Sequence, residues 1–265
     1  RRAGAQGDIK AAASGTGAYG GCKHEKGAAL LQKMTSARKS MSGNRIYHIA
    51  IDGPSGAGKS TVARNVAKKL GIAYLDTGAM YRAVGLYMQE NGVEMKEGCV
   101  CEALPGCKIE VDYDEAGGQR TLLNGRDVSE DIRRHCVSRL ASAVSAFPCV
   151  REHLVALQRE IAQKRSFVLD GRDICKYVLP QAEYKFFLTA SARERARRRC
   201  EELMAKGETV EPERVLKDIV DRDYADSHRA VAPLEQAEDA VVIDSTEMSI
   251  EAVTEKILAA VTEEK

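Results

Sequence analysis

The sequence predicts an α/β fold: a parallel five-stranded sheet with helices on both faces and a small antiparallel insert at about 95–135. Three observations support this prediction. Apolar runs alternate with stretches of helical spacing from Ile46 onward, which is typical of a parallel sheet covered by helices. A glycine-rich loop joins the first run to the first helix. The segment Lys108–Tyr113 instead alternates with a period of two, and Arg120–Leu123 returns after a turn, which is typical of an antiparallel hairpin.

The first strand is predicted at Ile46–Ile51 and leads into Gly53-Pro-Ser-Gly-Ala-Gly-Lys-Ser60, which fits the pattern G-x-x-x-x-G-K-[ST] at every defined position. A helix is predicted at 60–70, because apolar residues share one of its faces and Gly71 follows as a stop signal. Glycines let backbone N–H groups turn toward an anion, and the start of the helix adds the positive end of its dipole. Strand, loop and helix together predict a phosphate cradle.

Within this loop, Lys59 can reach the β- and γ-phosphates of a nucleotide, and the Ser60 hydroxyl can be a ligand of Mg²⁺. A glycine-rich turn that binds nothing is the alternative interpretation. The residues predicted to bind the nucleotide are Gly53, Pro54, Ser55, Gly56, Ala57, Gly58, Lys59, Ser60 and Thr61.

The remaining elements follow from the same periodicities. Further strands are predicted at 72–75, 166–169, 184–188 and 239–243, and further helices at 80–90, 137–146, 150–164, 191–206 and from about 250 onward. Ligands of such sheets lie at the carboxyl ends of the strands. We therefore expect the polar residues at those ends, Gly53–Ser60, Asp76–Thr77 and Asp170–Asp173, to converge on one cleft.

Arginine is frequent in and beside these strand-end segments, at Arg82, Arg151, Arg172, Arg222 and Arg229. Guanidinium groups match phosphate oxygens in pairs and keep their charge. Phosphoryl transfer needs such fixed cations more than it needs covalent chemistry by the protein. The arginines of 193–199 are equally consistent with a solvated helix face paired with nearby glutamates.

Composition limits the class of protein. The chain has 265 residues, 44% of them hydrophobic and 30% charged, with a net charge of +1, so bulk attraction to nucleic acid or membrane is not expected. No apolar stretch approaches the roughly 18 residues of a membrane span. The eight cysteines include no C-x-x-C pair. Free thiols in a reducing cytoplasm are the simplest expectation, ahead of a metal site at Cys99, Cys101 and Cys107.

Residues 1–44 are rich in Gly, Ala, Ser and Lys and have almost no apolar periodicity. We interpret them as a disordered or non-native extension, with Met41 as a candidate start. A basic transit peptide is the competing interpretation.

From Ile46 to Glu264 the sequence resembles the bacterial-type cytidylate kinases, a family of P-loop nucleoside monophosphate kinases. The D-[ST]-G-A-x-Y-R and R-A-V-A-P-L segments are far more specific than the loop. The stretches that carry the resemblance are Ile51-Asp-Gly-Pro-Ser-Gly-Ala-Gly-Lys-Ser-Thr61, Leu75-Asp-Thr-Gly-Ala-Met-Tyr-Arg82, Asn124-Gly-Arg-Asp-Val-Ser129, Ala141-Ser142, Phe147-Pro-Cys-Val-Arg-Glu152, Asp170-Gly-Arg-Asp173 and Arg229-Ala-Val-Ala-Pro-Leu234.

The resemblance implies Mg²⁺-dependent transfer of the ATP γ-phosphoryl group to CMP or dCMP. It implies one kinase domain over 45–265, with the 95–135 insert on the nucleotide side and an arginine-rich lid at about 191–210. It further implies a cytoplasmic monomer whose partners are small nucleotides, neither nucleic acid nor membrane. A P-loop kinase of another monophosphate, UMP or AMP, is the alternative. A switch GTPase is disfavoured because no N-K-x-D sequence occurs, and the intact loop disfavours a binding protein with a vestigial site.

The resemblance also implies residue roles. Lys59, Arg82, Arg172 and Arg229 are implied as catalytic groups. The groups implied to hold the acceptor phosphate or its approach are Thr77, Arg82, Arg172 and Arg229. The implied readers of cytosine are Ser142, Arg151 and Asp173, and the implied sugar contacts are Arg222 and Asp226.

One stretch departs from the family pattern. The family usually follows G-R-D with a hydrophobic residue and Gly-Thr, whereas this chain has Ile174-Cys175-Lys176. We expect Lys176 to add a cation next to the acceptor site and to influence the preference between CMP and dCMP.

Overall fold

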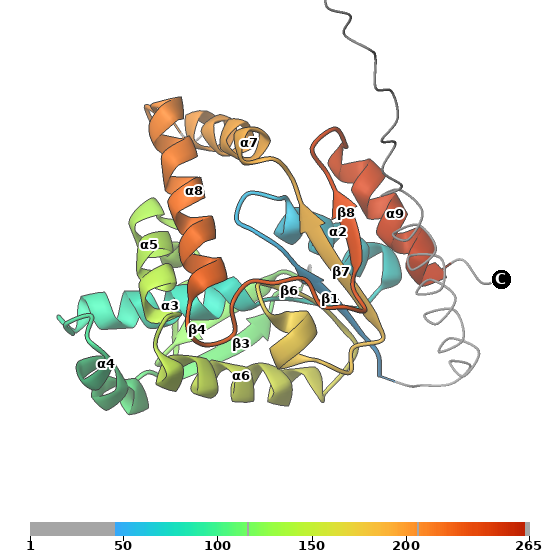
Figure 1. Cartoon of the computed structure of the whole chain (residues 1–265). Coiled ribbons are helices and arrows are strands. Elements are labelled where there is room, and N and C mark those ends of the chain that lie inside the picture. The colour runs from blue at the N-terminus through green and yellow to red at the C-terminus, as the bar shows by residue number, and fades with distance from the viewer. Residues whose placement is uncertain (1–45, 116, 206, 263–265) are drawn as a thin grey trace, which may run out of the picture.

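The computed structural model describes residues 46–262 except 116 and 206. The expectation for residues 1–44 lies outside the described residues. The described chain forms a parallel five-stranded sheet in the order β2-β6-β1-β7-β8 and a smaller three-stranded antiparallel sheet (Figure 1). The strands of the large sheet are β1 (His48–Asp52), β2 (Ala73–Asp76), β6 (Phe167–Gly171), β7 (Tyr184–Thr189) and β8 (Val241–Asp244). The predicted fold class is confirmed.

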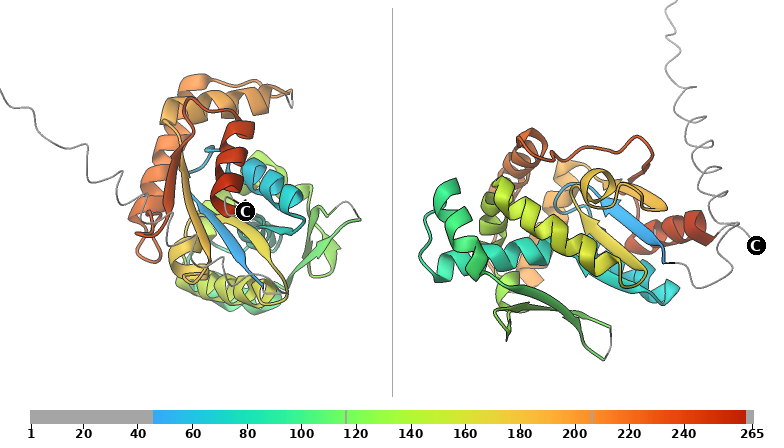
Figure 2. Two further views of the ribbon diagram at one scale, coloured as in Figure 1. Left: turned by 90° about the vertical axis from the view of Figure 1, so that its right-hand side faces the viewer. Right: turned by 90° about the horizontal axis from the view of Figure 1, so that it is seen from below.

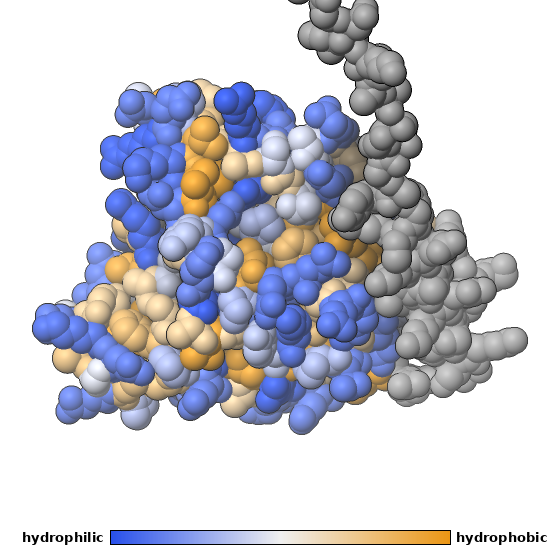
Figure 3. Space-filling model, in the orientation of Figure 1, coloured by the Kyte–Doolittle hydropathy of each residue, from blue (hydrophilic) through white to orange (hydrophobic). Residues whose placement is uncertain are grey.

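Helices cover both faces of this sheet. One core cluster joins α2 and α9 to Ile49 and Ile51 of β1, and the other joins α3 and α6 to Ala50 on the opposite face. α6 is seen crossing the sheet from below in Figure 2. α7 and α8 lie beyond the carboxyl ends of the strands (Figure 1), and hydrophilic residues cover most of their face shown in Figure 3. The helices are α2 (Lys59–Leu70), α3 (Thr77–Glu90), α4 (Glu97–Ala103), α5 (His135–Val144), α6 (Pro148–Ala162), α7 (Ala192–Ala205), α8 (Pro212–His228) and α9 (Ile250–Thr262).

The phosphate loop lies between β1 and α2 and depends on glycine where it turns. Gly53 has φ 145°, and a Cβ there would lie 1.9 Å from the Leu188 carbonyl oxygen of β7. Gly58 caps the start of α2 with φ 87°, and Gly71 ends the helix with φ 65°. Both angles lie in the left-handed region that favours glycine. The predicted strand, loop and helix are confirmed.

Two elements differ from the sequence-based prediction near the strand ends. α3 begins at Thr77, three residues before the predicted start, because the Asp76 carboxylate caps it by accepting the Ala79 N–H at 2.8 Å. A helical turn, η3 (Ile174–Val178), follows β6. Its first N–H groups are held by Asp52, whose carboxylate accepts from Ile174 N at 2.9 Å and from Cys175 N at 2.7 Å.

α8 was not predicted from the sequence. Only Ile219 and Asp226 of this helix are buried, so its apolar face is too narrow for the periodicity to reveal. Pro212 at its start is a signal that fits a first helical position. The helix contributes Arg222 and Asp226 to the site described below.

The 95–135 segment is partly helical. The predicted hairpin is confirmed as β3 (Ile109–Tyr113) and β4 (Gln119–Leu123), to which β5 (Arg126–Asp127) adds a short third strand. The segment is completed by α4 and the short turn η1 (Leu104–Gly106) before the hairpin, and by the turn η2 (Asp131–Arg133) after it. The hairpin projects from the body of the molecule in both views of Figure 2.

The expectation of free thiols is wrong for two cysteines. Cys101 of α4 and Cys149 of α6 form a disulfide, whereas the other described cysteines are free: Cys99, Cys107, Cys136, Cys175 and Cys200. The partners are 48 residues apart in sequence, so only the packing of α4 on α6 brings them together. Within the described part of the chain, no cluster of three or more His, Cys, Asp or Glu residues could hold a metal ion.

Among the helices described, none is by itself both long and apolar enough to cross a membrane, although Cys136–Val144 and Pro148–Ala162, bent by 98°, pass that test as a pair.

α3 and α5 are in close contact at Gly85. A Cβ at this position would lie 2.8 Å from Leu140 Cβ and 3.0 Å from the Leu140 carbonyl carbon. We expect Gly85→Ala to push α5 away and to lower the free energy of unfolding by about 1–3 kcal/mol, as overpacking does. Urea denaturation measures this change.

The matched control is Gly98→Ala in α4, where nothing lies within 4 Å of the added methyl group. Alanine favours a helix over glycine by up to about 1 kcal/mol, so this variant should be neutral or slightly more stable. Equal effects of the two substitutions would show that the α3–α5 contact is not tight.

Candidate functional site

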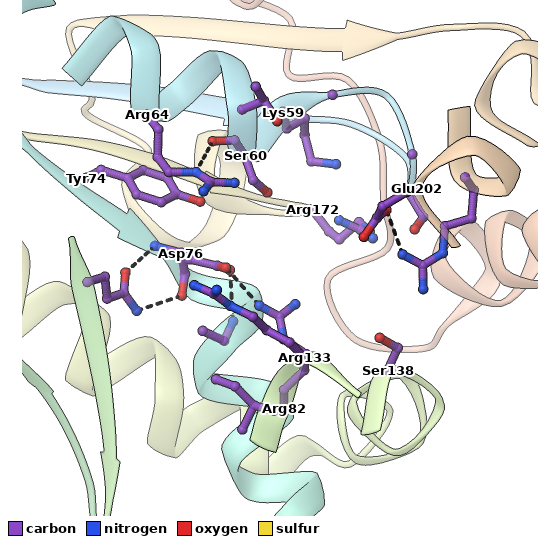
Figure 4. Close-up of a pocket in the computed structure, with 18 of the residues that line it drawn as sticks. Lys59, Ser60, Arg64, Tyr74, Asp76, Arg82, Arg133, Ser138, Arg172 and Glu202 are labelled. Atoms are coloured by element: carbon purple, nitrogen blue, oxygen red, sulfur yellow. Dashed lines mark hydrogen bonds and ion pairs between the residues drawn. The ribbon is translucent and has the colours of Figure 1, made fainter. Parts of the chain in front are cut away.

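A large cleft lies at the carboxyl edge of the sheet, between the phosphate loop, α3, α5, α7 and α8. Its volume is about 1630 Å³. Figure 4 shows Lys59, Ser60, Asp76, Arg82, Arg172 and Ser138 arranged around one space. The expected convergence of the strand-end residues on one cleft is therefore observed.

The phosphate loop forms one wall of the cleft. Six of its predicted residues line the cleft: Ser55, Gly56, Gly58, Lys59, Ser60 and Thr61. Gly53, Pro54 and Ala57 are buried and do not line the cleft. The Lys59 ammonium is buried and donates a hydrogen bond to the Pro54 carbonyl at 2.7 Å. Burial, and then repulsion by Arg172, lower the pKa of Lys59 to about 7.

Ser60 and Asp170 form the candidate metal position. The Ser60 hydroxyl donates to Asp170 Oδ2 at 2.8 Å, and the Tyr74 hydroxyl donates to Asp170 Oδ1 at 2.7 Å. Mg²⁺ takes oxygen ligands, commonly one or two from the protein together with phosphates and water, so a hydroxyl beside a carboxylate at the phosphate loop fits this ion. Asp170 was not predicted as a metal ligand, although a carboxylate directly after the strand predicted at 166–169 was the available signal.

Nine predicted substrate-binding residues line one pocket across from the loop. They come from α3, α5, α6, the loop after β6, α8 and the residue after α8. The nine are Thr77, Arg82, Ser142, Arg151, Arg172, Asp173, Arg222, Asp226 and Arg229. The structure brings all of these residues together, although they are spread over the segment 77–229 of the chain.

One end of this pocket is built around Asp173. The Arg151 guanidinium donates a hydrogen bond to the Asp173 carboxylate, and the side chains are only 3% and 6% exposed. Arg229 Nη2 lies 3.9 Å from the same carboxylate. The Tyr81 hydroxyl is buried without a hydrogen-bond partner among the described residues. This end therefore offers a carboxylate, guanidinium groups and hydroxyls within one confined space.

The other end of the pocket carries the remaining cations. Arg172 Nε donates to Asp226 Oδ2 at 2.8 Å, and Arg222 Nε lies 3.9 Å from it. Burial, and then Arg172, lower the pKa of Arg222 to about 10. Burial would raise the pKa of Asp226, but Arg172 and Arg222 outweigh it and hold the value below the ordinary one. Arg82 donates to Asp76 Oδ2 at 2.8 Å.

Several guanidinium donors in this pocket lack acceptors. Arg82 Nε, Arg222 Nε and Arg229 Nη2 are buried and have no hydrogen-bond partner among the described residues. Buried donors are normally paired, so three that converge on one pocket point to an anionic ligand. The Thr77 hydroxyl, by contrast, already donates to the Asp170 carbonyl at 2.7 Å.

The arginines of the 193–199 run differ in their surroundings, and Arg198 and Arg199 pair with Glu194 and Glu202 of their own helix. Arg198 and Arg199 line the cleft. Arg197 is 57% exposed and pairs with Glu194 and Glu201 of its own helix. Arg195 is buried and bonds to other segments.

The expectation that Lys176 adds a cation next to the acceptor site is wrong. Its ammonium lies 2.6 Å from Glu235 Oε1, and it does not line the pocket. η3 turns the chain after Asp173, and this turn carries Lys176 away from the pocket while burying Cys175.

The family described as "Cytidylate kinase" matches residues 49–263. A cytidylate kinase from Carboxydothermus hydrogenoformans is 52% identical over 79% of this chain and 95% of its own length. One from Caldicellulosiruptor saccharolyticus is 50% identical over 80% and 93%, and one from Streptococcus pneumoniae is 50% identical over 81% and 97%.

The lowered pKa of Lys59 predicts proton uptake when a nucleoside triphosphate binds. With a pKa of about 7, most Lys59 side chains are uncharged at pH 8. Negative phosphates beside the amine raise its pKa, so binding at pH 8 should take up to about one proton per site. Titration calorimetry in two buffers of different ionisation enthalpy measures this number. Uptake in the native chain that persists unchanged in Lys59→Met would assign the proton to another group.

Proposed function

Because this chain belongs to the cytidylate kinase family, we propose that it transfers the γ-phosphoryl group of ATP to CMP and dCMP, producing CDP and dCDP. The observation that carries this proposal is the set of unpartnered guanidinium donors that line the pocket opposite the Lys59 loop. Such donors suit the phosphate of a nucleoside monophosphate, while the loop suits a triphosphate.

The phosphate loop holds the donor nucleotide. Its backbone N–H groups and the start of α2 bind the phosphate chain, and Lys59 places a positive charge beside the transferred group. Ser60 and Asp170 would hold Mg²⁺, which would supply positive charge against the charge that develops on the phosphate groups. The short Ser60–Asp170 contact supports this placement.

The arginine groups hold the acceptor. Arg82, Arg172 and Arg229 bind the monophosphate in line with the donor. Arg172 can also stabilise the phosphoryl group while it is transferred. The acceptor needs no general base, because its phosphate, with a second pKa near 6, is already mostly a dianion at neutral pH. Arg222 and Asp226 are placed to contact the sugar, with Asp226 held in its charged form by its arginine neighbours.

Asp173, Arg151 and Ser142 read the base. Cytosine presents an amino donor beside acceptors at N3 and O2, which match a carboxylate and a guanidinium group. Uracil presents a carbonyl where cytosine has the amino group, and this oxygen would face the Asp173 carboxylate. The paired Arg151 and Asp173 therefore favour CMP over the UMP alternative.

We further propose that residues 45–265 form one kinase domain, that the segment of about 191–210 acts as its lid, and that the enzyme works as a cytoplasmic monomer. The net charge of +1 gives no bulk attraction to nucleic acid or membrane. Disulfides are rare in a reducing cytoplasm, so counting thiols in protein isolated under alkylating conditions tests the compartment directly.

Replacing Lys59 tests the reaction. We expect the native chain to form ADP with CMP and dCMP, and Lys59→Ala to lower turnover by about 10²–10³-fold with the fold intact. A coupled ADP assay across CMP, dCMP, UMP, AMP and GMP measures both results. The control is Lys69→Ala, whose ammonium is 53% exposed and pairs with Glu255. A near-normal rate in Lys59→Ala would contradict the assigned role.

Replacing Asp173 tests base selection. Asp173→Asn keeps the size of the side chain but adds an amide donor, which can bind the uracil carbonyl, so the CMP/UMP ratio of kcat/KM should fall. Asp112→Asn, whose carboxylate is 61% exposed on β3, is the control. If the ratio is unchanged in the folded Asp173 variant, this carboxylate does not read the base.

A further inference from the structure

We propose that Arg195 is a positioning residue that ties the phosphate loop to α8 and thereby couples the binding of the two nucleotides. The inference rests on the proposed function, since it assigns ATP to the loop and the monophosphate to the pocket that α8 helps to form. Arg195 does not line the cleft, so it acts through the groups that it holds.

The Arg195 guanidinium bonds three separate segments. Nη1 donates to the Ser55 carbonyl of the phosphate loop at 3.0 Å and to Asp223 Oδ1 of α8 at 2.9 Å. Nη2 donates to Asp223 Oδ2 at 2.6 Å, and Nε donates to the Ala190 carbonyl at 2.9 Å. The side chain is 5% exposed. A paired, buried guanidinium–carboxylate contact is a directional link rather than a surface ion pair.

The loop also touches Arg195 directly. Gly56 has φ 77°, and a Cβ there would lie 3.1 Å from Arg195 Cβ and 3.3 Å from the Arg195 carbonyl oxygen. The first turn of α7 therefore packs on the backbone of the phosphate loop. A displacement of this turn moves the loop residues that face the donor phosphates.

On the other side, Asp223 lies on α8 between two residues of the acceptor pocket. Arg222 precedes it, and Asp226 follows one turn later and accepts from Arg172 at 2.8 Å. The position of Asp223 against Arg195 therefore sets the distance between these acceptor groups and the phosphate loop. A nucleotide that orders the phosphate loop makes α8 easier to order, and the reverse also holds. Each nucleotide then increases the affinity for the other, which is binding cooperativity.

The test measures affinity for CMP with and without a non-hydrolysable ATP analogue, by titration calorimetry. We expect the analogue to tighten CMP binding to the native chain by about fivefold or more, and this factor to fall toward one in Arg195→Lys and Asp223→Asn. Lysine cannot reproduce the paired geometry. The double variant should lose no more coupling than either single variant, because both break the same link.

Arg197→Lys is the matched control, since Arg197 lies on the same helix but, among the described residues, forms its hydrogen bonds with Glu194 and Glu201. It should keep the native coupling factor. Asp223 is 27% exposed, and its amide variant keeps the side-chain volume, so it provides a folded test if Arg195→Lys loses stability.

Three results would overturn the proposal: no coupling in the native chain, native coupling in a folded Arg195→Lys or Asp223→Asn, or an equal loss in Arg197→Lys. Failure of the native chain to bind CMP at all would instead contradict the proposed function. The two inferences are therefore tested separately by one set of titrations.

Discussion

Mutual repulsion among buried cations is the constraint on which this site depends. Lys59 and Arg222 both have pKa values lowered by burial and then by the charge of Arg172, and burial followed by Arg151 lowers the pKa of Arg229. Such groups would separate if their backbones were free to move. The parallel sheet prevents this, because each cation is anchored at or near the end of a strand or on a helix packed beside it.

Carboxylates relieve part of this repulsion and also fix the geometry. Asp173 and Asp226 each accept a hydrogen bond from an arginine. Asp52 works differently, because it binds backbone N–H groups at the start of η3 and so holds the segment that carries Arg172 and Asp173. Burial, and then the neighbouring Asp173, raise the pKa of Asp52 to about 6. The pocket therefore places carboxylates and guanidinium groups together in one confined space.

The sheet and the phosphate loop could be predicted from the residues themselves, because each leaves a local signal. The members of the pocket were instead implied by the family resemblance, and the structure shows that they lie together. The buried strand β6 begins with the apolar run 167–169, and the loop is defined by its glycines. α8 leaves a weak signal, since only Ile219 and Asp226 are buried. The hydrogen-bond partners of Lys176 and Arg195 depend on segments distant in sequence, and no local pattern specifies such contacts.

The bond between Cys101 and Cys149 makes the insert and α5 part of one closed covalent ring. A ring of this size restricts the denatured chain by about 4 kcal/mol in the loop-entropy description. α5 contributes Ser142, and Arg151 lies just beyond the ring, so the end of the pocket around Asp173 is built on and beside this crosslinked segment. Reduced and oxidised chains consequently unfold to two different denatured ensembles. Denaturation curves recorded with and without a reductant therefore describe two separate unfolding equilibria.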